Sequence, residues 1–213
     1  MISMFDSIYI GQIPSGAAAV AGYVNGRWPT YASLVGRFPK AHVLSIAVSS
    51  YADAECLDVE KGDATNEVAA GWVKRQQARG VRKPVVYTSV SNARALLDAL
   101  AGEGIRRQDI RLWTAHYTFT AHLCGPACGF GFQGSADATQ YHDHAFGRSL
   151  DASLVADGFF PAPPAPVRKL WPVPVPQWFW AWAEWRRNGC ETMRPVDAPR
   201  VIPPWAWVRL KAL

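Results

Sequence analysis

Short apolar, β-branched segments alternate with helical stretches over the first 160 residues, and this alternation limits the possible folds more than any other feature. Alternating strands and helices form parallel sheets, because each helix carries the chain back to the end at which the next strand starts. We therefore expect an α/β fold. The segments with the composition of strands are 5–10, 18–24, 42–48, 55–59, 84–88, 110–115, 136–141 and 150–155.

Two of the intervening stretches have clear helix signals. Thr65 can cap a helix that runs to about Arg79, and Ser91 can cap a second helix over residues 92–100. The connections between the first three strands are too short for long helices. A full eight-stranded α/β barrel takes about 250 residues, so a barrel built from this chain of 213 must have shortened early units.

The composition changes sharply near residue 160, which divides the chain into three regions. We expect a barrel domain over residues 1–160, a Pro-rich linker or strap over 161–176, and a Trp-rich helical extension over 177–213. Seven of the ten tryptophans lie after residue 160, so the last two regions form a distinct part of the chain. Their rings either pack against the rest of the protein or form a surface for sugar rings or a protein partner.

The charge pattern restricts the partners that we expect. A net charge of +5 suits an anionic partner, or serves ordinary solubility. No cluster of Lys and Arg is interleaved with aromatic residues, so we expect no nucleic acid as a partner.

No apolar run reaches the roughly 20 residues of a membrane span. The opening residues lack the basic region of a signal peptide, so we expect synthesis in the cytoplasm without one.

Cys124 and Cys128 are the only closely spaced cysteines, and Gly and Pro lie between them. This turn can bring the two sulfurs together as a disulfide, or the residues can remain free thiols in a reducing compartment. With His122 they offer ligand types of a zinc site, but no second Cys/His pair stands at a familiar spacing. We therefore expect no metal, and we also expect no cofactor. His116 is either a proton shuttle or a hydrogen-bonded barrel residue, and we favour the second interpretation.

The segment Asp58-Val59-Glu60 in the fourth strand carries most of the chemical information. Carboxylates two residues apart on a strand point to the same face, and at the carboxyl end of a barrel strand that face opens into the site. Cleavage of a glycosidic bond needs a protonated carboxyl group as the acid and charged partners beside the cationic transition state. Repulsion between close carboxylates raises the pKa of one of them, which supplies that acid. We expect Asp6 and Asp151, in the first and last strands, to join the same mouth.

Six motifs follow one another along the chain: Asp6, Asp58-x-Glu60, Tyr87-Thr88-Ser89, Leu112-Trp113-x-Ala115-x-Tyr117, Gln140-Tyr141 and Asp151. Their order resembles that of the glycoside hydrolase family 25 lysozymes, and most closely a related group of glycoside hydrolase-like barrels from actinobacteria and their phages. The resemblance covers roughly residues 4–160. The fold that it implies is a compact TIM-type (β/α)8 barrel with shortened early units, followed by a C-terminal Pro/Trp-rich extension.

The resemblance implies a peptidoglycan-cleaving muramidase, such as a phage lysin, that acts on the cell-wall bond between N-acetylmuramic acid and N-acetylglucosamine. It implies that Glu60 is the general acid and that Asp58 positions or stabilises a neighbouring species such as the N-acetyl group of the substrate. It makes Asp6 and Asp151 supporting acids. Such a protein would act at the cell wall or as part of a phage particle. The residues expected to line the sugar cleft are Tyr87, Trp113, Tyr117 and Gln140.

Two departures from the family pattern support an alternative. The second strand reads Ala-Gly-Tyr-Val-Asn-Gly-Arg instead of the Lys-Ala-Thr-Glu-like family stretch, and Ser153 stands where the family has Asn. The alternative is a catalytically weak or inactive module that binds glycan or serves a structural role, for example as a component of a phage particle. A third interpretation is a barrel that acts on another envelope polysaccharide.

Overall fold

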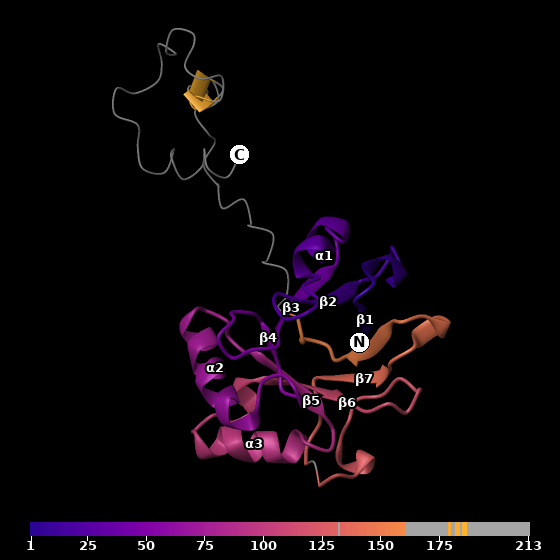
Figure 1. The fold of residues 1–213 in the computed structure, drawn as a ribbon. Coiled ribbons are helices and arrows are strands. Elements are labelled where there is room, and N and C mark those ends of the chain that lie inside the picture. Colours follow the sequence, from indigo (N-terminus) through magenta and orange to yellow (C-terminus); the bar gives the residue numbers. More distant parts are fainter. Residues whose placement is uncertain (132, 161–178, 180–181, 184, 187–213) are drawn as a thin grey trace. The chain divides into compact units, whose positions relative to one another are not determined.

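A computed structural model describes residues 1–131, 133–160, 179, 182–183 and 185–186 of the chain. Eight strands close into a barrel in the order in which they occur in the sequence (Figure 1). The expected α/β barrel is therefore confirmed. The strands are β1 (Ile2–Asp6), β2 (Ala19–Tyr23), β3 (His42–Ala47), β4 (Cys56–Asp58), β5 (Val85–Ser89), β6 (Arg111–Ala115), β7 (Ala138–His142) and β8 (Asp151–Val155).

The described part of residues 1–160 contains three α-helices: α1 (Tyr31–Arg37), α2 (Asn66–Ala78) and α3 (Ala93–Gly102). Both helices predicted from the sequence are thus confirmed, although the N-cap of the second is Asn92 and not Ser91. The Asn92 amide exchanges hydrogen bonds with Asn66, which ties the beginning of α3 to that of α2. Single 3-10 turns occur at Ile10–Gln12, Arg107–Asp109, Pro126–Cys128 and Ala145–Gly147.

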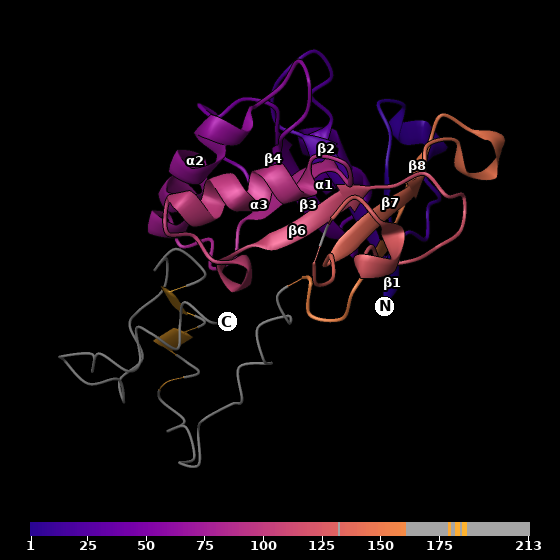
Figure 2. The same cartoon turned by 90° about the horizontal axis from the view of Figure 1, so that it is seen from below.

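Helices α2 and α3 lie side by side on one flank of the barrel (Figures 1 and 2). Their apolar faces bury a shared core in which Trp72 of α2 and Leu96 and Leu100 of α3 are almost completely enclosed. Complete burial of one large apolar side chain stabilises a fold by about 1.5–3 kcal/mol. This cluster therefore fixes β4, β5 and β6, the strands that carry three of the six sequence motifs.

A second core fills the interior of the barrel. Side chains from several strands meet there, among them Met4, Leu44, Cys56 and Val85, and each is buried. Because the interior is packed, a ligand can bind only at an end of the barrel.

The last strand departs from the expected (β/α)8 arrangement. Strands β1 to β7 are each parallel to the next, whereas β8 is antiparallel to both β7 and β1. Only residues 143–150 connect β7 to β8, which is fewer than the dozen or so that a parallel crossover needs. The chain therefore turns back, and β8 begins with Asp151 at the end of the barrel where β1 finishes with Asp6.

The chain divides into two units, Met1–Pro161 and Ala162–Leu213. The Pro-rich linker predicted over residues 161–176 lies outside the described residues. In the predicted extension, the described residues are helical, and among them Phe179 and Trp182 are buried with ring centroids 5.9 Å apart. None of the helices in the described part of the chain combines the length and the apolar character that a bilayer crossing requires.

Candidate active site

A cavity of about 180 Å³, here termed the acidic cavity, contains every residue that the sequence predicted for the site. Its lining includes all four expected acids and all four expected cleft residues. The structure therefore brings the eight side chains together, and it adds Tyr23 and Ile46. The complete lining is Asp6, Tyr23, Ile46, Asp58, Glu60, Tyr87, Trp113, Tyr117, Gln140 and Asp151.

Strand direction explains why the acids meet. Asp6 is the last residue of β1 and Asp58 is the last of β4, and the carboxyl ends of parallel strands lie at one end of a barrel. Asp151 reaches the same end because β8 runs the other way and starts there. Asp6 and Asp151 are direct partners in the β1–β8 register, so their side chains project from the same face.

Asp6 and Asp151 form a coupled pair of carboxyl groups. Burial raises the pKa of Asp6 well above its usual range, and the neighbouring Asp151 raises it further. Burial also raises the pKa of Asp151, although hydrogen bonds with Asp6 and Gln140 oppose this change. Two adjacent carboxyl groups ionise one at a time, so Asp6 holds the proton that the pair shares.

Asp58 is only 3% exposed, and its surroundings favour the neutral acid. Burial, followed by the charges of Glu60 and Asp63, raises the pKa of Asp58 to about 8, while a hydrogen bond with Tyr23 acts in the opposite direction. Asp58 Oδ1 and Asp6 Oδ2 are buried and have no hydrogen-bond partner within the described residues. A bound molecule with hydroxyl or amide groups would supply the missing partners.

Glu60 lies two residues beyond the end of β4, in a short turn at the mouth of the barrel. The N–H of Asp63 donates to the Glu60 carbonyl, and Gly62 adopts the left-handed conformation that the turn requires (φ +102°). Glu60 is partly buried, and this burial, with the charge of Asp63, raises the pKa of its carboxyl group. The surroundings of Glu60 therefore favour its protonated form, while the side chain remains accessible to a ligand.

The cleft residues are held by hydrogen bonds from one strand to another. Tyr87 donates to Gln140 Oε1 over 2.5 Å, and the Trp113 indole donates to Ser153 Oγ over 3.1 Å. The rings of Tyr87 and Trp113 contact each other, with centroids 4.6 Å apart. Ser153 thus has a role here, although the sequence singled it out only as a departure from the family pattern. Tyr117, which is 46% exposed, forms part of the rim.

Two further cavities adjoin the acidic cavity through shared residues. The α2 cavity, of about 700 Å³, is lined by Glu60 together with residues at the start of α2, such as Thr65 and Asn66. The β2 cavity, of about 240 Å³, is lined by Tyr23 together with Trp28 and other residues that follow β2. Because Glu60 and Tyr23 each line two of these spaces, the three form one series across the mouth of the barrel.

Tyr23 is the residue that sequence reasoning missed. It closes β2, and its hydroxyl group helps to hold Asp58, so it belongs to the centre of the site. The available signal was its position as a polar aromatic residue at the carboxyl end of a strand. The resemblance to the family did not point to Tyr23, because the second strand, which contains it, departs from the family pattern.

The acidic cavity has a distinctive charge. Its ionisable lining residues are carboxylic acids and tyrosines, with no Lys or Arg among them. An anion would be repelled, whereas hydroxyl and amide groups of a sugar would find donors and acceptors. A carboxyl group that stays protonated near neutral pH can donate that proton, and its charged neighbours can stabilise a cationic intermediate. The arrangement therefore has the components of acid-catalysed glycosidic bond cleavage.

The two cysteines singled out in the sequence lie outside this cavity. Cys124 and Cys128 are free thiols in the structure. The sequence left two states open for them, free thiols or a disulfide, and the disulfide stays a prediction. Both lie in the connection between β6 and β7.

Neither a protein-family model nor a curated protein sequence matches this chain. A solved structure with a similar fold is that of an uncharacterized protein from B. stearothermophilus. The two superpose with a TM-score of 0.53 and 14% sequence identity, over 74% of this chain and 97% of the other. At this level of identity the likeness shows that the chain shares the barrel fold of that protein.

Proposed function

We propose that the chain is a lysozyme-type glycoside hydrolase, a muramidase that cleaves bacterial peptidoglycan. We further propose that its barrel is a shortened TIM-type barrel related to the family 25 lysozymes and the glycoside hydrolase-like group. The observation that carries the proposal is the convergence of all eight motif residues on one acidic cavity. Residues from six strands or from the loops that follow them meet there, and the resemblance singled out each of them from the sequence alone.

Glu60 is the proposed general acid. It is the acid that lines both the acidic cavity and the α2 cavity, so a sugar chain crossing from one to the other would pass its carboxyl group. Its raised pKa favours the protonated form that an acid needs. Because the protonated form is the active one, the rate should fall as the pH rises through that pKa.

The other three acids have supporting roles in the proposal. The Asp6–Asp151 pair shares a proton and retains one negative charge, which would stabilise the oxocarbenium-like transition state. Protonated Asp58 would donate a hydrogen bond to the N-acetyl group of the substrate and fix its orientation. These roles use the buried carboxyl oxygens that have no partner among the described residues.

The series of three cavities supports a polymer as the substrate. A single sugar would fit within the acidic cavity, whereas a glycan strand would extend into the adjoining α2 or β2 cavity. Trp28, which is 49% exposed, and Tyr117 offer aromatic faces for sugar rings at the edges. We accordingly propose the cell wall, or a phage particle that attacks it, as the place of action.

The test compares the wild type with Glu60→Gln on purified peptidoglycan, by loss of turbidity and release of reducing ends. Glu103→Gln is a matched control, because the Glu103 side chain is 62% exposed and pairs with Lys74 far from the lining residues. We expect Glu60→Gln to lower kcat by roughly 10²–10⁴-fold, the usual contribution of a general acid. The control should keep wild-type activity, and circular dichroism should show that both variants fold.

Two outcomes would contradict the proposal. Full activity of Glu60→Gln would remove Glu60 from the reaction. A folded wild-type protein that binds walls without digesting them, where a control lysozyme does, would favour the glycan-binding or structural alternative.

A further inference from the structure

Four side chains of types that bind metal ions meet in the connection between β6 and β7. They are His116, His122, Cys124 and Cys128, and their ligand atoms all lie within 4.8 Å of one another. None of the four lines the acidic cavity, so the proposed reaction leaves the cluster unexplained. Imidazole nitrogen and cysteine sulfur are the donors that Zn²⁺ prefers.

The three distances among the donor atoms of His116, His122 and Cys124 match the edges of one face of a zinc tetrahedron. With Zn–N bonds of about 2.05 Å and Zn–S bonds of about 2.3 Å, ideal tetrahedral angles place two nitrogens about 3.3 Å apart and a nitrogen and a sulfur about 3.6 Å apart. His116 Nδ1 lies 3.2 Å from His122 Nε2, and Cys124 Sγ lies 3.5 and 3.7 Å from the same two nitrogens. A hydrogen bond between the two imidazoles would account for the first distance but not for the second cysteine, whose sulfur lies within 4.8 Å of the other three donor atoms.

The His122 ring is oriented for coordination. Its Nδ1 lies 2.8 Å from the Thr120 carbonyl oxygen, which can only accept a hydrogen bond, so Nδ1 carries the proton. The neutral ring then has its lone pair on Nε2, the atom that faces His116 and Cys124. Metal-binding histidines usually donate their second nitrogen to such an oxygen, which fixes the tautomer.

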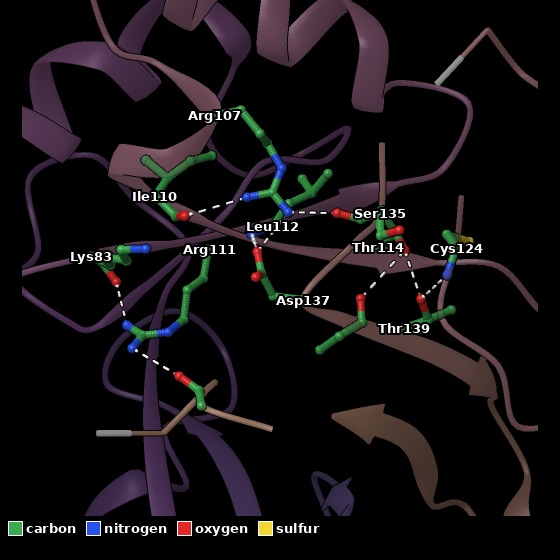
Figure 3. A network of polar contacts seen from close by, with 12 residues as sticks. Lys83, Arg107, Ile110, Arg111, Leu112, Thr114, Cys124, Ser135, Asp137 and Thr139 are labelled. Atoms are coloured by element: carbon green, nitrogen blue, oxygen red, sulfur yellow. Dashed lines mark hydrogen bonds and ion pairs between the residues drawn. The ribbon is translucent and has the colours of Figure 1, made fainter. Parts of the chain in front are cut away.

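The barrel holds Cys124 in place. Its N–H donates to Thr139 Oγ1 over 2.8 Å, and Thr139 in turn bonds to Thr114 on the neighbouring strand (Figure 3). The Cys124 carbonyl accepts from Ala136, so both sides of the residue are fixed to the start of β7. Cys128 ends the 3-10 turn that follows, and its N–H bonds back to Gly125.

The connection itself needs a stabilising element. Residues 116–137 contain only the short 3-10 turn among their described positions, whereas the β4–β5 and β5–β6 connections each contain a packed α-helix. Loops of this length without secondary structure are uncommon in compact domains. Phe119 and Phe130 also adopt left-handed conformations (φ 58° for both), which persist only where surrounding contacts enforce them. A metal ion would supply such contacts.

We propose that His116, His122, Cys124 and Cys128 bind one Zn²⁺ as a closed structural site that fixes the β6–β7 connection. Four protein ligands leave no coordination position for water, which is the arrangement of structural and not catalytic zinc. Two thiolates balance the charge of the ion, so the partly buried centre is neutral. Since Tyr117 follows His116 directly, the zinc also holds this part of the rim of the acidic cavity.

This proposal revises the expectation of no metal. The spacing His-x5-His-x-Cys-x3-Cys matches no familiar pattern, and His116 was interpreted as a hydrogen-bonded barrel residue. The fourth ligand became evident only when the fold brought it to the other three.

The first measurement is the metal content of the full chain, purified without a histidine tag under reducing conditions. We expect about one zinc ion per chain by elemental analysis. The half-buried Cys128→Ser variant and His122→Ala should lose it, whereas His144→Ala, which changes a 70% exposed histidine outside the cluster, should retain it. Cobalt(II) in place of zinc should give the intense visible absorption of tetrahedral thiolate coordination in the wild type and not in Cys128→Ser.

The second measurement is thermal unfolding, which remains informative if a variant fails to fold. Wild-type protein stripped with a chelator and then given free zinc at about 100 times its Kd should show a rise in Tm of roughly 5–10 °C. Neither measurement depends on turnover of glycan, so the result stands apart from the proposed function. A zinc-free wild type whose Tm and cobalt spectrum do not respond to added metal would overturn the proposal, as would zinc binding by Cys128→Ser that equals the wild type.

Discussion

Asp58 ends β4 in surroundings that oppose its ionisation, since burial and the charges of Glu60 and Asp63 raise its pKa to about 8. The sequence predicted a raised pKa from the repulsion between Asp58 and Glu60. In the structure that repulsion is the second cause, after burial. Which of the two causes is larger depends on how deeply the end of the strand is buried. The spacing of residues along the chain does not give this depth.

This environment makes stability depend on pH in a definite direction. The folded state keeps the Asp58 proton up to about pH 8, whereas the unfolded chain loses it near the ordinary pKa of 3.8, so stability falls as the pH rises between these values. In Asp58→Asn this contribution is absent. We expect the difference in the free energy of unfolding, variant minus wild type, to become more positive as the pH rises from about 5 to about 7, by up to about 1.4 kcal/mol per pH unit.

Urea denaturation of both proteins across that pH range checks this expectation. Asp98→Asn serves as the control, because the Asp98 side chain is 62% exposed and pairs with Arg94 on the surface of α3. A difference between Asp58→Asn and the wild type that stays constant with pH would show that Asp58 is charged in the folded state.

At the scale of elements, a partly buried polar contact joins the beginnings of β6 and β7 (Figure 3). Asp137 Oδ2 accepts from the Leu112 N–H over 2.8 Å and from Arg107 over 2.7 Å, and its own N–H donates to the Leu112 carbonyl. Arg107 also donates to the carbonyls of Ser135 and Ile110. One carboxylate thus completes the hydrogen bonding of two strands and of the turn that precedes β6.

We expect Asp137→Ala to lower the free energy of unfolding by about 1–3 kcal/mol, because it leaves the Leu112 N–H and the Arg107 guanidinium without their acceptor. The contrasting variant is Asp98→Ala, which breaks an exposed i, i+4 pair with Arg94 and should cost at most about 0.5 kcal/mol. Chemical denaturation measures both. Equal losses would mean that the Asp137 contacts contribute no more than a surface ion pair.

The elements differ in how well the sequence predicted them. The segment predicted at 55–59 matches β4, and the two predicted helices match α2 and α3, because apolar periodicity and flanking turns mark them clearly. The first strand was predicted at 5–10 but runs from Ile2 to Asp6, so the acid ends the strand. The direction of β8 could not be predicted from composition, since an antiparallel and a parallel strand have similar residues and only the length of the preceding connection distinguishes them.

At the scale of the whole molecule, charge is unevenly divided along the chain. Residues 1–160 contain 14 basic and 14 acidic residues, whereas residues 161–213 contain eight basic and three acidic ones. The entire net charge of +5 therefore belongs to the region after the barrel. This division suits the proposed function, because the basic region would attract an anionic wall while the acidic cavity remains without competing cations.

We expect the double variant Arg168→Gln/Lys169→Gln to adsorb to isolated, anionic cell walls about tenfold more weakly than the wild type at low salt. At high salt the difference between the two proteins should disappear, because the charges are screened. Lys40→Gln/Arg82→Gln is the control, because it removes the same charge from exposed positions on the barrel. Co-sedimentation over a series of NaCl concentrations measures the effect. Equal weakening by both double variants would show that total charge matters and its position does not.

The reversed direction of β8 also decides where the barrel can be extended. Val155 pairs with Ile2, and the Met1 ammonium group pairs with Asp157, so the chain enters and leaves the barrel together, at the end away from the acidic cavity. Phe159 then packs under the interior core and closes that end. A gene fusion at residue 160 or at the N-terminus consequently joins the barrel at its closed base. A circular permutant that links these two ends needs only a short linker, and its new termini can be placed in a surface loop.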